Sequence, residues 1–303
     1  MKVREFFKAG FGNCLNISNG VIELEVTLDL GPRIISYKLI NGSNMLNEIG
    51  KVDPIHTEFG DFYCYGGHRF WHAPEVKPRS YIPDNNPISY SILDNKVVFT
   101  FFFEVETGIQ KSMEITLFNN TKVEINHILE NKNMWDIKIA PWALTVVKPG
   151  GRLIIPSEPF KSHADELLPA RPLVLWQYTK MNDPRYTWGD RFITVRNDES
   201  NDTAQKIGLA DKQGWAAYEV NNNVFIKKFP YEEGKKYPDN GCNLETFTKG
   251  SFHEFETLGY LRKLHTGESC SYIEEWYLFD NIEMNDCEEN MSNVLSSLLE
   301  KAK

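Results

Sequence analysis

Residues 21–30 read Val-Ile-Glu-Leu-Glu-Val-Thr-Leu-Asp-Leu, and from Ile22 onward apolar and polar side chains alternate. This period of two predicts a β-strand with one buried face. After a break at Gly31-Pro32, the stretch 33–40 (Arg-Ile-Ile-Ser-Tyr-Lys-Leu-Ile) predicts a second strand. Strand signals of this kind recur along the chain, so this opening pair sets the fold class.

Two hairpins follow. Residues 88–93 and 96–105 flank a turn at Asp94-Asn95, and residues 110–118 and 122–129 flank a second turn. The remaining strands are expected at 137–146, 152–156, 191–196, 206–210, 215–220, 223–229, 242–248, 252–260 and 269–279. Many short strands with regular turn signals predict an all-β sandwich or barrel. We expect one domain over residues 1–303.

The clear helix signal lies at the C-terminus, in residues 286–302. An apolar stripe (Met291, Val294, Leu295, Leu298 and Leu299) suits a helix packed on a sheet, and Asp286 and Glu289 have the spacing of a capping box. Residues 157–190 are irregular and rich in Pro, Trp and Tyr, and a loop of that length is usually functional.

Composition excludes several classes of partner. The chain has 303 residues, 41% of them hydrophobic, which suffices for a large core, and its net charge is −9. An acidic chain is a poor partner for nucleic acid or an anionic membrane. No apolar run suits a signal peptide or a membrane span, and five cysteines without a CxxC motif favour reduced thiols. We expect a cytoplasmic protein; nothing in the sequence indicates an oligomeric state.

The stretch richest in chemically useful side chains is 63–75, Tyr-Cys-Tyr-Gly-Gly-His-Arg-Phe-Trp-His-Ala-Pro-Glu. Gly66-Gly67 and Pro74 argue against a helix and predict a loop. Its Arg69, Trp71 and Glu75 combine an aromatic face with charged hydrogen-bonding groups. This combination suits a sugar, which has apolar C–H faces and a rim of hydroxyls.

Glu254 and Glu256 form a second candidate site. On a strand they point to one face, where like charges raise a carboxyl pKa and prepare a general acid or base. The plain alternative is a solvated face on an edge strand. Glu274 and Glu275 point to opposite faces, so at most one of them joins a given site.

Further candidates are single residues. Lys228, Tyr237 and Asp239 lie around a predicted turn at Pro238–Gly241 and could bind a polyol, although each alone suits an ordinary surface position. Trp142 follows a proline in an apolar strand, where it is either core or a stacking platform.

We expect no metal and no cofactor. His68 and His72 are four residues apart, which would suit a helix face, but Pro74 and the glycines oppose a helix, and HExxH is absent. The GxSxG motif of serine hydrolases and the phosphate-binding GK[ST] loop are also absent.

The order of these features resembles the galactose mutarotase (aldose 1-epimerase) superfamily, within it the uncharacterised mutarotase-like branch. The resemblance runs from Asn19-Gly20-Val-Ile-Glu-Leu and Gly31-Pro-Arg-Ile-Ile-Ser-Tyr, through Gly67-His-Arg69 and Phe255-Glu256-Thr257, to Glu275-Trp276. It covers nearly the whole chain and implies a single β-supersandwich with a sugar-binding face.

The resemblance also implies residue roles. Glu256 matches the family's general base and Arg69 its sugar-binding arginine. The family's acid is a histidine, and by ungapped reading Trp142 stands in its place here. His68 or His72, beside Arg69, could supply the acid instead.

Three functions follow as hypotheses. The first is an aldose 1-epimerase-like isomerase with Glu256 as base, His72 or His68 as acid, and Arg69 with Asp239 or Glu254 as sugar anchors. The second is a non-catalytic sugar-binding module with Trp71 and Trp142 as platforms. The third is glycoside hydrolase or lyase chemistry, for which Glu75 and Glu256 are the available carboxylate pair.

Overall fold

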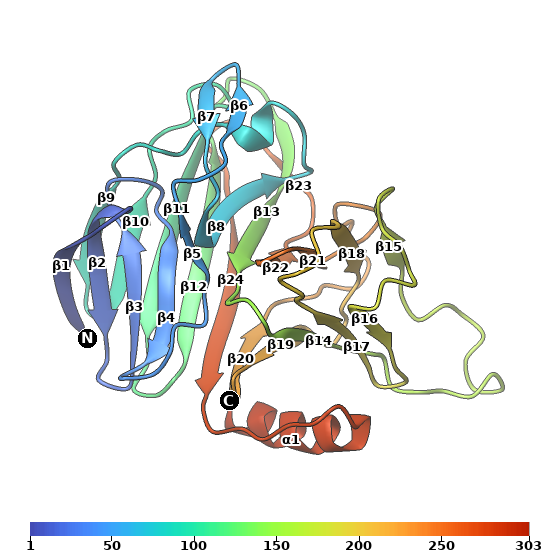
Figure 1. Cartoon of the computed structure of the whole chain (residues 1–303). Helices are drawn as coiled ribbons and strands as arrows, with labels where there is room; N and C mark the ends of the chain where they lie inside the picture. The colour runs from blue at the N-terminus through green and yellow to red at the C-terminus, as the bar shows by residue number, and fades with distance from the viewer. Residues whose placement is uncertain (303) are drawn as a thin grey trace.

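A computed structural model describes residues 1–302 of the chain. Two large antiparallel sheets pack face to face, and one helix lies at the C-terminal end (Figure 1). Alternation along the strands explains this arrangement, because each sheet turns one apolar face toward the other. The all-β fold class expected from the sequence is confirmed.

The first sheet has twelve strands. Its path is β1 (Lys2–Lys8), β2 (Gly12–Ser18), β3 (Ile22–Thr27), β4 (Ile34–Leu39), β8 (Tyr65–Ala73), β13 (Ile137–Val146), β22 (Phe252–Leu258), β21 (Leu244–Lys249), β18 (Gln205–Leu209) and β15 (Leu173–Leu175). Two short strands join it from the side: β5 (Glu48–Gly50) pairs with β8, and β23 (Arg262–Leu264) pairs with β13.

The second sheet has ten strands. Its order is β16 (Tyr186–Trp188), β17 (Phe192–Arg196), β14 (Arg152–Pro156), β19 (Trp215–Val220), β20 (Asn223–Lys228), β24 (Ser269–Phe279), β12 (Val123–Asn131), β11 (Ile109–Leu117), β10 (Lys96–Thr100) and β9 (Ser89–Leu93). A separate hairpin, β6 (Ile55–Thr57) with β7 (Gly60–Phe62), and a 3₁₀ turn, η1 (Arg79–Tyr81), lie beyond the end of β8 that Figure 1 shows at the top.

The main core fills the space between the two sheets. It draws on both of them, with Phe70 and Phe255 from the first sheet and Ile125, Phe225 and Trp276 from the second. Burying such apolar surface is the main stabilising term of the fold.

The C-terminal helix α1 (Glu288–Lys301) packs on the other face of the ten-stranded sheet, against β14, β19 and β20. Met291, Leu295 and Leu298 are its buried residues, which confirms the apolar stripe. The predicted capping box is wrong, because the N-cap is Cys287 and makes no side-chain capping bond. Asp286 instead pairs with Arg152 and Arg196 of the sheet.

The prediction of a loop over residues 63–75 is also wrong. Most of that stretch is β8, in which every residue is buried. Gly66 and Gly67, at the start of this strand, let neighbouring backbone approach closely, and both have positive φ. A Cβ at Gly66 would lie 2.1 Å from the carbonyl oxygen of Asn47, and a Cβ at Gly67 would lie 2.3 Å from that of Ile34. Side chains on this segment therefore alternate between two buried faces.

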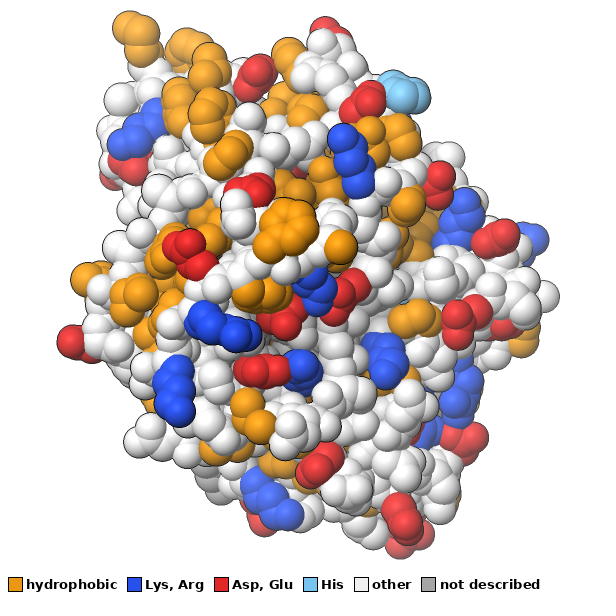
Figure 2. Space-filling view, turned by 60° about the vertical axis from the view of Figure 1, so that its left-hand side comes forward, with side chains coloured by type: hydrophobic (Ala, Val, Ile, Leu, Met, Phe, Trp, Pro, Cys, Tyr) orange, Lys and Arg blue, Asp and Glu red, His pale blue; other side chains and the backbone are white. Residues whose placement is uncertain are grey.

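Several short strands carried too little periodicity to be predicted: β5, β6, β7, β15 and β16, together with the longer β1 and β2. Residues 157–190 are otherwise irregular, as expected. Within residues 1–302, no helix combines the length and apolarity needed to cross a bilayer. Figure 2 shows acidic and basic side chains interspersed over one face of the molecule, in keeping with a modest overall charge.

Candidate functional site

The candidate site lies on the face of the twelve-stranded sheet that points away from the other sheet. Strand alternation places Arg69 and Trp71 of β8, Trp142 of β13 and both Glu254 and Glu256 of β22 on this face. The strands β8, β13 and β22 are direct neighbours (Figure 1). Leu144 of β13 pairs in register with both Arg69 and Glu256. The prediction that Glu254 and Glu256 share one face is confirmed, and the alternative of a solvated edge strand is wrong.

These residues surround a cavity of about 260 Å³, which we call the Glu256 pocket. Loops and neighbouring strands complete its wall. The lining residues are Ile55, Phe62, Cys64, Arg69, Trp71, Glu75, Tyr81, Trp142, Leu144, Tyr178, Lys206, Phe247, Phe252, Glu254 and Glu256. A volume of this size is at the small end of ligand sites and suits one compact ligand.

Arg69 is held on one side of the Glu256 pocket. Its Nη2 lies 2.8 Å from Oε1 of Glu254, its Nη1 donates to Sγ of Cys64 at 3.3 Å, and its guanidinium lies 4.7 Å over the ring of Trp71. Both partners of the ion pair are nearly fully buried. Arg69 is therefore a fixed, preorganised cation at the pocket wall.

Lys206 is the second cation and was not predicted. Its Nζ lies 2.8 Å from Oε2 of Glu245 and 3.0 Å from Oε2 of Glu256, between the rings of Trp142 and Trp176. It comes from β18, which reaches β22 only through β21. No sequence signal marks it except its position on the strand expected at 206–210.

Glu256 is the most perturbed carboxyl that lines the pocket. Its Oε2 accepts hydrogen bonds from Trp142 Nε1, at 3.0 Å, and from Lys206, whereas its Oε1 has no hydrogen-bond partner in the part of the chain that the structure describes. Burial raises the pKa of the Glu256 carboxyl to about 7, against the opposing effect of Lys206. A buried carboxyl with a pKa near neutrality and a free oxygen is suited to accept a proton.

Trp142 combines the two roles left open by the sequence. It is buried, it lines the pocket, and its indole N–H is bound to Glu256. Its ring meets that of Trp71 edge to face at 5.3 Å. Trp71 and Trp142 together form an aromatic wall of the Glu256 pocket.

His68 and His72 do not line the pocket. They lie on the opposite face of β8, turned toward the ten-stranded sheet, where His68 contacts His127 and His72 contacts Glu104. The prediction that His68 or His72 faces Glu256 as the acid is therefore wrong, because neither side chain points into the pocket. Alternation is the reason, because Arg69 and Trp71 occupy the pocket face and the residues on either side of them must point the other way.

His68 belongs to a buried polar network behind the pocket. His127 Nδ1 donates to the carbonyl oxygen of Tyr272, so its Nε2 accepts from His68 Nε2 at 2.8 Å. His68 Nδ1 then accepts from Thr145 Oγ1 at 2.8 Å. This pattern needs both imidazoles to be neutral, and burial lowers the pKa of each, that of His127 to about 4.

The same network contains the one group of side chains in residues 1–302 with metal-ligand geometry. The ligand atoms of His68, His127 and Glu274 lie within 4.8 Å of one another. All three residues are already hydrogen-bonded, and the ammonium of Lys227 lies 3.0 Å from Glu274. The residues present thus fit an internal charge network better than a divalent cation.

Three other candidates lie outside the Glu256 pocket. Lys228 contacts the carbonyl oxygen of Ala302 and the ring of Tyr277. Tyr237 stacks on Tyr231, and Asp239 lies in the turn before Cys242. None of the three is among the residues that line the cavity. Glu75 does line it and is exposed, with one oxygen bound to the hydroxyl of Tyr81.

The irregular segment 157–190 contributes residues to the wall of the pocket. Tyr178 lines the cavity, and Trp176 lies over Lys206. The many aromatic residues of this segment were the sequence signal for its part in a site, but composition could not show which rings face the pocket.

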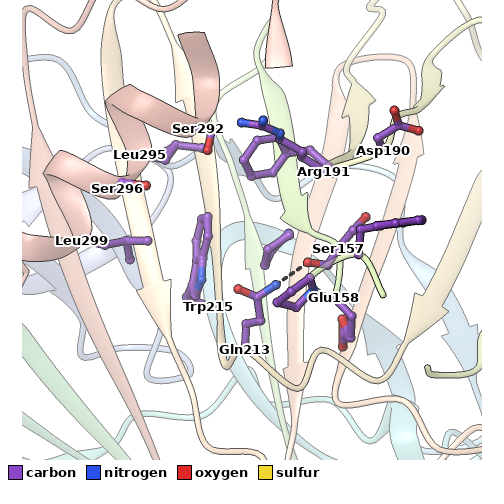
Figure 3. A pocket seen from close by; sticks show the side chains of 14 residues that line it. Ser157, Glu158, Asp190, Arg191, Gln213, Trp215, Ser292, Leu295, Ser296 and Leu299 are labelled. Carbon is purple, nitrogen blue, oxygen red and sulfur yellow. Dashed lines mark hydrogen bonds between the residues drawn. The ribbon is translucent and has the colours of Figure 1, made fainter. Parts of the chain in front are cut away.

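A larger cleft of about 670 Å³ lies between α1 and the segment 156–160 (Figure 3). Trp215 and Gln213 face Ser292, Leu295, Ser296 and Leu299 of the helix across it, and Gln213 donates to the carbonyl oxygen of Ser157. Its charged lining residues are Glu158, Asp190 and Arg191, all more exposed than the charged residues Arg69, Glu254 and Glu256. Because buried, perturbed carboxyls mark functional sites, we place the candidate site in the Glu256 pocket.

Comparisons with known proteins support the fold. No protein-family model matches the sequence, and the search of curated proteins gave no match. Among solved structures, a galactose mutarotase-like protein from Lactobacillus casei has a TM-score of 0.59 at 12% identity, covering 88% of this chain and 100% of that one. One from Clostridium acetobutylicum has a TM-score of 0.55 at 13% identity, covering 92% and 99%.

A third match shows the fold within a longer protein. A TPR-domain containing protein from Parabacteroides distasonis has a TM-score of 0.60 at 13% identity, covering 90% of this chain but 48% of that one. The chain therefore has the galactose mutarotase-like fold. At these identities the likeness concerns the fold, and the fold hosts more than one kind of protein.

Proposed function

We propose that this chain, with its galactose mutarotase-like fold, binds a single sugar unit in the Glu256 pocket. The observation that carries the proposal is the free Oε1 of Glu256, a buried acceptor that faces a small cavity walled by aromatic rings. A buried polar atom without a partner costs free energy unless a ligand supplies the missing hydrogen bond. A sugar hydroxyl is such a donor.

The other walls support the same ligand class. Trp71 and Trp142 offer apolar faces for the C–H groups of a pyranose ring. Arg69 offers a donor, since its Nε has no acceptor among residues 1–302. The combination of fixed aromatic faces with a few convergent polar groups is typical of specific small-molecule sites.

Binding without catalysis is the function that the geometry favours. Within residues 1–302 no imidazole lines the Glu256 pocket, and the indole of Trp142 is bonded to Glu256. Interconverting anomers needs a donor to the ring oxygen as well as a base for the anomeric hydroxyl. Lys206 is a poor donor: burial opposes its charge, but Glu245 and Glu256 hold its pKa well above the usual value.

One observation favours aldose 1-epimerase-like catalysis as a second candidate. The pKa of Glu256, raised by burial to about 7, suits a general base at neutral pH. In that case Glu256 would take the proton of the anomeric hydroxyl, the ring C–O bond would break, and a water molecule would protonate the ring oxygen.

The test measures binding and mutarotation separately. A panel of aldohexoses is titrated by NMR against the wild type, Glu256→Gln and the partly exposed control Glu130→Gln, which lies outside the pocket. We expect millimolar or tighter binding of at least one sugar, weakened roughly tenfold in Glu256→Gln and unchanged in the control. Absence of binding across the panel would refute the proposal.

Polarimetry on the same panel separates the two candidates. No acceleration of mutarotation by the wild type, together with measurable binding, is the outcome expected of a binding protein. If the wild type accelerates mutarotation and Glu256→Gln abolishes the acceleration, the protein is an isomerase and not a non-catalytic binding protein.

A further inference from the structure

The charges around the Glu256 pocket are unequal in number. Three carboxylates line it, those of Glu75, Glu254 and Glu256, and Glu245 contacts Lys206 from behind. Two cations, Arg69 and Lys206, face these four acidic groups. When all four acidic groups are ionised the surplus is negative, in and around a small cavity where solvent screening is weak. Burial raises the pKa of Glu256 to about 7 and that of Glu245 well above its usual value, so protons offset part of this charge until a cation takes their place.

Both cations already form ion pairs within the protein. Arg69 is paired with Glu254, and Lys206 is shared by Glu245 and Glu256. A ligand carboxylate or phosphate would have to compete with buried glutamates for them. Anionic sugars are therefore poorly matched to this pocket.

The acceptors, by contrast, are incompletely satisfied. Oε1 of Glu256 has no hydrogen-bond donor, and Oε1 of Glu254 has the Arg69 contact without a well-aligned hydrogen bond. Both residues are more than nine-tenths buried. Neighbouring acceptors of this kind call for a ligand with several donors, ideally with a positive charge to relieve the repulsion between them.

The aromatic lining is compatible with such a charge. Arg69 and Lys206 already lie over the rings of Trp71 and Trp142, at 4.7 Å and 5.1 Å. Phe62, Tyr81, Tyr178 and Phe252 also line the cavity. Ring faces attract cations and thus add to the carboxylates.

We infer that the ligand of the Glu256 pocket is a cationic sugar, an amino sugar whose free ammonium group is held by Glu254 and Glu256. This inference rests on the proposed sugar-binding function and adds the charge of the ligand. The ammonium supplies three donors to the carboxylate oxygens, and the remaining hydroxyls face Arg69 Nε and the pocket rim.

The test uses matched sets of sugars that differ at one position. Glucosamine, galactosamine and mannosamine are each compared with the parent hexose and with the neutral N-acetyl derivative, at about pH 7, where most of the free amine is protonated and about half of Glu256 is ionised. We expect the best amino sugar to bind roughly five- to tenfold tighter than both of its neutral counterparts. Glucose 6-phosphate, as an anionic probe, should bind more weakly than glucose.

Two variants link the preference to named carboxylates. Glu254→Gln, with its fold verified by an NMR spectrum, should lose most of the preference for the amino sugar. Glu75→Gln changes an exposed rim residue and should reduce the preference by a smaller factor, while Glu130→Gln leaves it unchanged.

The outcomes separate this inference from the proposed function. Equal binding of glucose and glucosamine would overturn the cationic ligand and leave sugar binding intact. If none of the probes binds, both the proposed sugar binding and the cationic ligand are refuted. An amino-sugar preference that survives in Glu254→Gln would also overturn the inference, because the charge would then be recognised elsewhere.

Discussion

Lys227 and Glu274 form an ion pair 3.0 Å long in which neither side chain has any exposed surface. Lys227 Nζ also donates to Thr145 Oγ1 at 2.6 Å and to the carbonyl oxygen of Phe255 at 3.3 Å. It thereby ties β20 and β24 of one sheet to β13 and β22 of the other. Phe255 immediately precedes Glu256, so this pair supports the pocket from behind.

Breaking this pair should be costly. Lys227→Met leaves the carboxylate of Glu274 buried without its cation, and we expect a loss of about 3–5 kcal/mol in the free energy of unfolding. The double variant Lys227→Met/Glu274→Met should recover much of that loss, because no buried charge remains. Urea unfolding measures both, with the exposed Lys132→Met as control; a loss below about 1 kcal/mol in the single variant would contradict the structure.

The stability of the Glu256→Gln variant should depend on pH in a defined direction. Burial raises the folded pKa of Glu256 from 4.5 to about 7. A raised carboxyl pKa contributes stability that is present below the unfolded value and is lost as pH rises through the folded one. Relative to wild type, Glu256→Gln should therefore gain about 3 kcal/mol between pH 4.5 and pH 8. A difference that stays flat over this range would show that Glu256 is not buried as described.

The buried pair His68 and His127 should make the free energy of unfolding depend on pH in the opposite direction to Glu256. Burial lowers the pKa of His127 from 6.5 to about 4. The unfolded chain then binds one more proton between these values, so stability is present above pH 6.5 and is lost as pH falls toward 4. In His127→Gln the slope of unfolding free energy against pH should be shallower by up to about 1.4 kcal/mol per pH unit. Measurements near pH 7.5 give the baseline cost of the substitution, and an unchanged slope would refute the neutral pair.

Gly66 should tolerate no side chain. A Cβ there would lie 2.1 Å from the carbonyl oxygen of Asn47, in addition to the strain of φ +81°. Gly20 has a similar φ of +90° with open space around it, which makes Gly20→Ala a matched control. We expect Gly20→Ala to cost about 1 kcal/mol and Gly66→Ala at least about 3 kcal/mol by thermal or urea unfolding. Equal losses of stability in the two variants would mean that backbone strain alone, without the clash, accounts for the need for glycine at position 66.

Much of the fold was predictable because strand signals are local. The strands expected at 137–146, 152–156, 215–220 and 269–279 match β13, β14, β19 and β24 residue for residue. Alternation also showed that Glu254 and Glu256 share a face, since this depends only on their spacing. Arg69, Trp71, Glu75 and Trp142 were chosen from residue type, local sequence context and the family resemblance, and all four line the Glu256 pocket.

By itself, then, the sequence determined the all-β class, most of the strands, the C-terminal helix and the pairing of Glu254 with Glu256 on one face. Only the tertiary structure decided that this face lines a pocket, that His68 and His72 point away from it, and that Lys206 joins Glu256 there. The physical reason is that alternation sorts the side chains of a strand into two faces without saying what each face meets. That depends on strand order, which brings β8, β13, β22, β21 and β18 together from segments far apart in the chain.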